Sequence, residues 1–274
     1  MFLVTLLPVL YLVVTSFTPL TLTQPSTIGD FSTPLKNYTL LFSDTRLHDS
    51  VWTQVKLSVF TVSLQLLLGL GAALLLHSRS SSTDFLRAVF LVPMVLPPIV
   101  VAVIWKVLYS PDISPAWWLF TKLNWQVPAP ISDARLALPA IIAAETWEWF
   151  PFTMLIILAA LKTMPEDWFE AARIDGAEFW QITWHITLPN LRGVLLVAGL
   201  FRLIDSIKTF PLIYILTEGG PGTTTEVTNY YVFVQAFNFS FLGYSSAVSV
   251  MLVISVIALS WFIVRTVEGG ARNG

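Results

Sequence analysis

The sequence has no cysteine and few charged residues, and these two absences exclude whole classes of protein. Without cysteine there are no disulfides, no thiolate nucleophiles and no zinc–thiolate sites. Charged residues make up 12% of the 274 positions, about half of the ~25% that is typical of a soluble domain. The net charge of −2 is uninformative, but no basic patch suited to nucleic acid is present, so we expect no nucleic acid partner. A soluble globular protein is likewise excluded.

Motifs for bond chemistry are also missing. The chain has no Gly-x4-Gly-Lys-Ser/Thr loop to cradle nucleotide phosphates, no Gly-x-Ser-x-Gly nucleophile elbow and no His-Glu-x-x-His zinc pair. The histidines His48, His77 and His185 are isolated from one another in the sequence, so no metal site is expected. We therefore expect a chain that is not an enzyme and that binds no cofactor of its own.

Long apolar runs are what the sequence has in abundance. Uncharged runs cover residues 57–76, 88–105 and 227–264. A bilayer core of ~30 Å needs about 20 apolar residues per helical span, whereas barrel strands are about half as long and alternate in polarity. The predicted fold class is an all-α membrane protein with six transmembrane helices. They are expected at residues 1–20, 51–76, 87–109, 136–161, 191–217 and 241–264.

The ends of the chain are predicted to lie in the cytoplasm. The first apolar run has the hydrophobicity of a signal peptide, but it lacks the positive n-region and the small-residue cleavage pattern, so we expect it to be retained as a span. Lysine and arginine number seven in the loops 78–87 and 162–192 and the tail after 264, against four in the other loops. The positive-inside rule therefore predicts that the first set of loops, and both termini, are cytoplasmic.

The loop at 162–192 is too structured for a plain connector. Pro165 and the two acidic residues after it predict a helix start, and Gly176 predicts its end. A second short helix is expected from 177 to about 187, with Pro189 breaking it and starting the next span. Aromatic residues on one side indicate either a docking element or a hairpin that packs under its own bundle.

The same loop contains the pattern Glu-Ala-Ala-x3-Gly-x9-Ile-x-Leu-Pro, complete and at regular spacing. It resembles the signature of the membrane subunits of bacterial ABC importers that use a binding protein, and the string EAARIDGA is the form seen in their carbohydrate-type branch. The resemblance implies a type I ABC importer permease core whose cytoplasmic coupling helix-turn-helix seats in a cleft of the ATPase subunit. The coupling residues it implies are Glu170, Ala171, Ala172, Asp175, Gly176, Ile186, Leu188 and Pro189.

Two further segments carry the resemblance. Residues 91–112 look like the third span of sugar-type permeases, and LTEGGPGTTTEV at 216–227 is similar to a segment of the larger maltose-system and glycerol-phosphate-system subunits. The basic cytoplasmic leader usual in the family is absent. The resemblance implies a first span and extracytoplasmic segment at 1–50, a permease core at 51–264 and a cytoplasmic tail at 265–274.

The resemblance also implies partners and a location. The partners are an ABC ATPase dimer that binds ATP and Mg, a second homologous permease subunit and an extracytoplasmic solute-binding protein. The substrate is a sugar or sugar-like solute: a di- or oligosaccharide, a polyol or a sugar phosphate. The location is the bacterial cell (inner) membrane, which the chain crosses several times.

Charged residues inside the predicted spans indicate a second candidate site. Arg202, Asp205 and Lys208 follow one another at i, i+3 and i+6 in the fifth span, and Glu145 and Glu148 lie one turn apart in the fourth. Such residues line a cavity or pair with one another, because a lone charge in the bilayer is costly. Both interpretations, a polar substrate passage and a structural ion pair, remain open. Aromatic residues that either stack on sugar rings or simply pack complete the passage candidates: Trp147 and Phe210.

Two alternatives concern movement and energy. Pro97 and Pro98 free backbone carbonyls within the third span, so they form either a hinge near the passage or a plain kink. An autonomous secondary transporter, driven by an ion gradient through Glu145, Glu148 and Asp205, is the alternative to an ATP-driven permease subunit.

Overall fold

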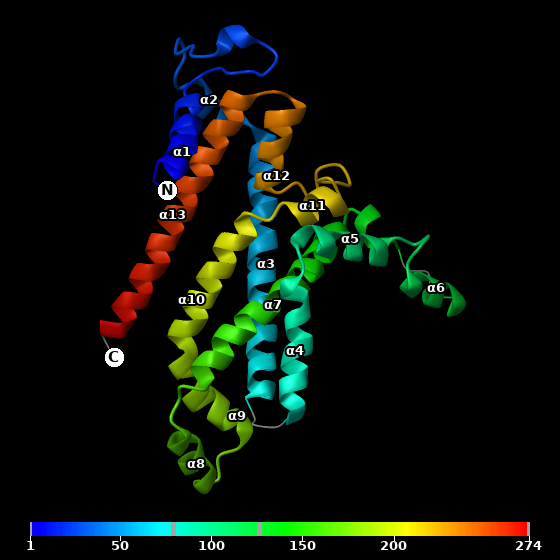
Figure 1. Ribbon diagram of the computed structural model, residues 1–274, viewed down its shortest axis with the longest axis vertical. Coiled ribbons are helices and arrows are strands. Elements are labelled where there is room, and N and C mark those ends of the chain that lie inside the picture. The colour runs from blue at the N-terminus through cyan, green and yellow to red at the C-terminus, as the bar shows by residue number, and fades with distance from the viewer. Residues whose placement is uncertain (1, 78–80, 125–127, 273–274) are drawn as a thin grey trace.

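The computed structural model describes residues 2–77, 81–124 and 128–272, and within them every regular element is a helix (Figure 1). Arg79, counted above among the cytoplasmic cations, lies outside the described residues. The α-helices are α1 (Phe2–Ser16), α2 (Lys36–Ser43), α3 (Thr45–Leu76), α4 (Ser81–Val95), α5 (Pro98–Tyr109), α6 (Pro115–Lys122), α7 (Ala137–Leu161), α8 (Glu166–Ile174), α9 (Phe179–Ile182), α10 (Leu188–Ile207), α11 (Pro211–Leu216), α12 (Thr228–Phe233) and α13 (Leu242–Arg272). Single π turns cover Thr183–Thr187 and Val234–Asn238, and 3₁₀ turns cover Pro25–Thr27 and Pro130–Ser132.

Four helices of the described chain are long and apolar enough to cross a membrane: α3, α7, α13 and the continuous helix Phe179–Ile207. The helices α4 and α5 are each too short to cross alone, and they count as a fifth span only if the pair, bent by 97°, is taken as one. Helix α1 is apolar, but its 15 residues fall short of the about 20 that a bilayer core needs. The predicted all-α membrane fold is confirmed, while six as the number of spans stays a prediction.

The predicted third span at 87–109 is wrong as a single helix. Pro97 has no N–H to donate and disfavours helical geometry in the residue before it. Its backbone is extended, with φ −59° and ψ 139°, and Pro98 starts α5 as its first residue. The pair of prolines therefore turns the chain by nearly a right angle, so that α5 leaves the bundle sideways (Figure 1).

The predicted fifth span at 191–217 begins earlier and ends earlier than expected. Pro189 does not break the helix, because the π turn at Thr183–Thr187 precedes it and Leu188 donates its N–H to the carbonyl of Thr183. The wider turn makes room for the proline ring and its missing donor. The helix then ends at Ile207, and Pro211 starts the separate helix α11.

Helices α3 and α7 form the central seam of the bundle and cross at close range. A Cβ atom added to Gly69 on α3 would lie 2.0 Å from Oγ1 of Thr153 and 2.9 Å from the backbone nitrogen of Met154. Leu57 and Ile141 are fully buried along the same pair of helices. Only glycine allows this approach, and the seam fixes the polar side chains described below.

Helix α3 begins at the end of the bundle opposite α8 (Figure 1), and Asp44 is its N-cap residue. Its carboxylate accepts hydrogen bonds from the Leu47 amide at 3.1 Å, the Tyr244 hydroxyl at 2.6 Å and the Tyr231 hydroxyl. Burial raises the pKa of Asp44, but these donors together with the backbone of Arg46 outweigh it and hold the pKa below its usual value. One carboxylate thus joins α3, α12 and α13, of which α12 was not among the predicted helices.

Candidate functional site

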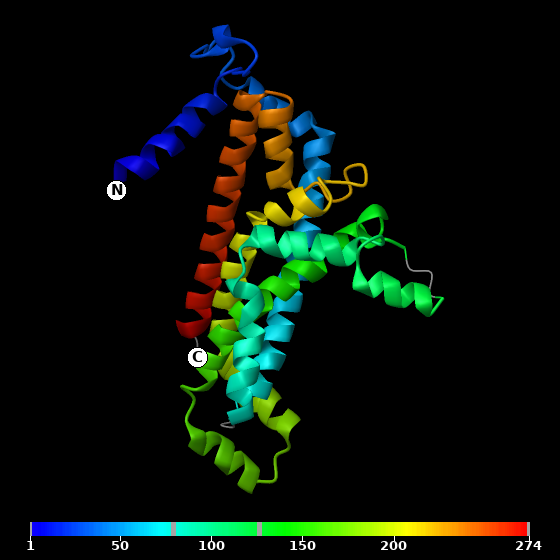
Figure 2. The same cartoon turned by 45° about the vertical axis from the view of Figure 1, so that its right-hand side comes forward.

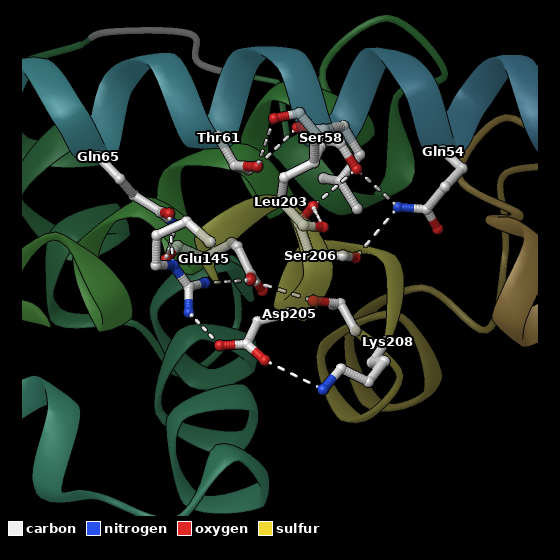
Figure 3. Close-up of polar contacts among 12 residues, drawn as sticks. Gln54, Ser58, Thr61, Gln65, Glu145, Leu203, Asp205, Ser206 and Lys208 are labelled. Carbon is white, nitrogen blue, oxygen red and sulfur yellow. Dashed lines mark hydrogen bonds and ion pairs between the residues drawn. The ribbon is translucent and has the colours of Figure 1, made fainter. Parts of the chain in front are cut away.

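Arg202 is fully buried in the middle of the bundle, and all three nitrogens of its guanidinium group have polar partners. Its Nε donates to Oε1 of Gln65 at 2.9 Å, Nη1 donates to Asp205 at 3.2 Å, and Nη2 reaches Oε1 of Glu145 at 3.4 Å (Figure 3). The guanidinium carbon lies 4.5 Å from the ring centroid of Trp149. The predicted charges of the fourth and fifth spans therefore form one cluster that joins α3, α7 and α10.

The cluster continues toward the end of α10. Lys208 pairs with Asp205 at 3.2 Å, and Thr209 donates a hydrogen bond to Oε1 of Glu145 at 3.1 Å. The i, i+3 spacing of Arg202, Asp205 and Lys208 is thus realised as two successive ion pairs on one face. A buried carboxylate and a buried guanidinium are tolerated here because each has several partners.

A polar stripe on α3 completes the cluster and was not predicted. Gln54, Ser58, Thr61 and Gln65 follow the spacing i, i+4, i+7, i+11, which puts them on one face of an otherwise apolar helix (Figure 3). The stripe faces α7 and α10: Gln65 donates to the backbone carbonyl of Glu145 at 3.0 Å, and Ser206 donates to Ser58 at 2.8 Å. This spacing was the signal in the sequence that could have revealed the face.

A cavity of about 220 Å³ opens beside the cluster. The structure brings five predicted charged residues and one of the predicted prolines to its wall and leaves the other three candidates elsewhere. Trp147 packs edge-on against Trp105 with ring centroids 5.8 Å apart, and Phe210 stacks on Tyr214 at 5.4 Å. The lining residues are Pro98, Glu145, Glu148, Trp149, Arg202, Asp205, Lys208, Thr209, Pro211 and Leu212.

The second candidate site, the loop at 162–192, has the predicted start and turn. Pro165 directly precedes α8 at its N-cap position, and two acidic residues lie in the first turn. At the other end Ala177 donates to the carbonyl of Ala172 at 2.9 Å and Gly176 to that of Arg173 at 3.1 Å, which together form a Schellman cap. Gly176 has φ +80°, a conformation that a residue with a Cβ rarely adopts.

Five large apolar side chains of this loop are exposed. Both Trp180 and Trp184 have 65% of their surface exposed, and Ile174 has 85%. On the same continuous helix Thr183 and Thr187 are buried against the bundle, so the exposed side chains point away from it. We call these five residues the apolar surface of the loop: Trp168, Ile174, Phe179, Trp180 and Trp184.

The residues of the signature lie beside this surface. Glu170, Ala171, Asp175, Gly176 and Pro189 are exposed, whereas three others are half-buried. Helix α8 lies at the lower end of the molecule in both views, outside the bundle of long helices (Figures 1 and 2). The half-buried residues of the signature are Ala172, Ile186 and Leu188.

The described side chains include no group of three or more histidines and carboxylates placed to hold a metal ion. A helical membrane bundle with a charged cavity in its middle and an apolar surface on a loop outside it is the architecture of a membrane transport protein.

The chain belongs to the family described as binding-protein-dependent transport system inner membrane components, which matches residues 65–268. It is 36% identical to the trehalose/maltose transport system permease protein MalF of Thermococcus litoralis, over 87% of this chain and 80% of that protein. It is 33% identical to the sulfoquinovosyl glycerol transport system permease protein SmoG of Agrobacterium fabrum, over 89% and 79%. It is therefore a multi-pass membrane permease rather than an enzyme.

The fold agrees with this family. A crystal structure of a bacterial ABC transporter that imports the acidic polysaccharide alginate matches with a TM-score of 0.83, covering 97% of this chain and 91% of that chain at 18% identity. The architecture predicted from the sequence, a type I ABC importer permease, is thus confirmed. The same comparisons do not favour an autonomous secondary transporter.

Proposed function

We propose that the chain is the permease subunit of an ATP-driven sugar importer that receives its cargo from an extracytoplasmic binding protein. The relatives named above are permease subunits of systems for trehalose/maltose and for sulfoquinovosyl glycerol. The observation that carries the proposal is the apolar surface of the loop at 162–192. Large apolar side chains gathered on a loop outside the bilayer indicate an interface with another protein.

The partner for this surface is an ATPase subunit. The apolar surface and the exposed Glu170 and Asp175 lie on one helix-turn-helix, and the signature Glu170–Pro189 is the one that couples such permeases to their ATPase. The alternative, a hairpin that packs under its own bundle, is less favoured because Trp180 and Trp184 remain two-thirds exposed. ATP and Mg would bind to the ATPase, since this chain has no phosphate-binding loop.

A second permease subunit is required by the same logic. The chain has one coupling loop, whereas a dimer of ATPase subunits offers two clefts. A homologous permease chain would supply the second loop and close the passage from the other side. In this arrangement both termini and the loop 162–192 lie in the cytoplasm, and the membrane is the inner membrane of the cell.

The cavity beside Arg202 is the proposed passage for the cargo. It is lined by groups that donate and accept hydrogen bonds, as sugar hydroxyls require, and it lies between α7, α10 and the bend at Pro98. Movement of the loop at the end of α7 and the start of the helix Phe179–Ile207 would shift both walls of this cavity, because those two helices carry Glu145 and Arg202.

The turn at Gly176 provides the test. A Cβ at this position meets no atom within 4 Å, so the effect of a substitution comes from the backbone conformation alone. Gly176→Val should abolish ATP hydrolysis stimulated by the loaded binding protein, because a β-branched residue at φ +80° costs about 1–3 kcal/mol and re-aims the loop. Gly176→Asn is the matched control, because asparagine tolerates this region.

Both variants would be reconstituted with the ATPase, the partner permease and the binding protein, and their membrane insertion compared. Stimulated hydrolysis that is equal in Gly176→Val and in the unmodified chain would refute the coupling role. Uptake of solute by vesicles that contain this chain alone, under a proton or sodium gradient, would instead support the secondary-transporter alternative.

A further inference from the structure

Glu148 carries a buried carboxyl group that nothing in the described chain satisfies. Its side chain is 1% exposed and lines the cavity, and neither of its carboxyl oxygens has a hydrogen-bond partner. Its neighbour Glu145, one turn away, has Arg202 and Thr209 as partners. Buried acceptors in proteins are satisfied by protein, water or ligand, so an unpartnered one at a cavity wall is open to a hydrogen-bond donor that enters the cavity.

The cations of the cavity are already engaged. Arg202 donates hydrogen bonds to Gln65, Glu145 and Asp205, and one face of its guanidinium group lies against the ring of Trp149. The ammonium group of Lys208 pairs with Asp205 at 3.2 Å. The wall therefore has three carboxyl groups against two cations, and neither cation is left without a counter-charge. An anionic ligand would therefore find no free cation in the wall of this cavity.

We propose that this cavity admits an uncharged polyhydroxylated cargo, a sugar or polyol, and rejects phosphorylated or sulfonated ones. The inference rests on the proposed function, since it takes the cavity as the cargo passage. Glu148 is the specificity-determining residue: its carboxyl group forms hydrogen bonds with cargo hydroxyls and supplies no positive charge to a phosphate or sulfonate. Among the relatives, this places the chain with the trehalose/maltose permease rather than with the permease for the sulfonated glycoside.

The test uses proteoliposomes that contain the assembled complex and its binding protein. The probes are radiolabelled trehalose and maltose on one side and sn-glycerol 3-phosphate and sulfoquinovosyl glycerol on the other. We expect ATP-dependent uptake only among the uncharged probes. Glu148→Gln and Glu148→Ala should each raise the sugar concentration for half-maximal uptake by roughly 10-fold, because each removes at least one acceptor oxygen and so about one hydrogen bond to the cargo.

A stability measurement separates this role from a structural one. A carboxyl group without partners does not hold the fold, so both variants should unfold at the same temperature as the unmodified complex or at a higher one. The matched control is Glu218→Gln, since Glu218 is exposed in the loop after α11, away from the cavity. This variant should keep both the half-maximal concentration and the unfolding temperature.

Two results would overturn the inference while leaving the proposed function intact. One is ATP-dependent uptake of either anionic probe by the unmodified complex. The other is an unchanged half-maximal concentration in both Glu148 variants. Failure of the proposed function looks different, because uptake would then proceed without ATP or without the ATPase subunit.

Discussion

The middle of the bundle and the loop below it are opposite in character. Where the bilayer surrounds the chain, Arg202, Glu145 and the stripe on α3 bury charges and amides. On the loop at 162–192, below the bundle, Trp180 and Trp184 expose apolar rings. Each region has the polarity that its surroundings disfavour, and each cost is of the order of a few kcal/mol.

The difference shows what each region is for. Among the described residues, the interior cluster satisfies most of its own groups, and Glu148 is the charged residue of the cavity wall whose side chain has no hydrogen-bond partner. The cluster is therefore a structural core with a place open for a ligand at Glu148. The loop satisfies its backbone through the cap at Gly176 but leaves its apolar side chains uncovered. The interior therefore governs the stability of the chain, and the loop governs its association.

The largest effect is expected at Arg202. Arg202→Ala leaves Glu145 buried without its counter-charge, which costs about 3–5 kcal/mol. The unfolding temperature of the purified chain in detergent, followed by circular dichroism, should fall steeply. The double variant Arg202→Met with Glu145→Gln should recover part of the loss, because it removes both charges. A single variant as stable as the unmodified chain would mean that the cluster is not a structural core.

The seam that positions the cluster is tested at Gly69. Gly69→Ala forces a methyl group to within 2.0 Å of the Thr153 hydroxyl, and overpacking of this kind costs about 1–3 kcal/mol. Gly71→Ala is the matched control on the same helix, since nothing lies within 4 Å of its Cβ. This control should be neutral or gain up to about 1 kcal/mol of helix propensity. Equal unfolding temperatures for the two variants would contradict the close approach of α3 and α7.

The long apolar helices and the turn at Gly176 could be predicted from the sequence because their signals are local. An uncharged run of 20 residues such as 57–76 is long enough to cross a bilayer as a helix, and a glycine that follows an amphipathic helix is typical of a helix end. The interruptions were harder to predict. Pro97 bends the chain by 97°, whereas Pro189 is absorbed by a π turn. Which of these a proline does depends on whether the preceding turn can widen, and that depends on packing.

The candidate site shows the same division. The charged residues could be predicted because a charge within an apolar run is costly and therefore rare. Their uncharged partners on α3 could not, since glutamine and serine occur in many sequence contexts without a special role. Gln65 becomes significant only when α3 lies against α7 and α10. Trp147 and Trp149, two positions apart, face different surroundings: one packs on Trp105 and the other lies under Arg202. Helix periodicity separates their directions but does not say which direction holds the cavity.

A smaller effect on stability is expected at Asp44, where a polar network meets water. Asp44→Asn keeps a helix cap but weakens the hydrogen bonds from Tyr231 and Tyr244, at a cost of roughly 1 kcal/mol. Because the pKa of Asp44 is lowered in the folded chain, its contribution is fully present above the unfolded value of about 3.9 and is lost as the pH falls through the folded value.

The difference in unfolding temperature between Asp44→Asn and the unmodified chain should therefore be constant from pH 7 to pH 5 and shrink below about pH 4. A difference that grows on acidification would contradict the lowered pKa. Because α3 begins at the end of the bundle opposite α8 (Figure 1), association with the ATPase should not change in this variant.

The smallest effect on stability, and the sharpest contrast with Arg202, is expected on the loop. Trp180→Ala and Trp184→Ala remove side chains that are 65% exposed, so each should change the free energy of unfolding by no more than about 0.5 kcal/mol. Buried tryptophans at interfaces are worth about 2 kcal/mol or more, so the affinity for the ATPase should fall roughly 30-fold. Trp52→Ala, which removes a tryptophan 60% exposed on α3, is the matched control and should keep that affinity. Loop variants that destabilise the chain as Arg202→Ala does, yet still bind the ATPase, would show that the exposed rings belong to the fold rather than to an interface.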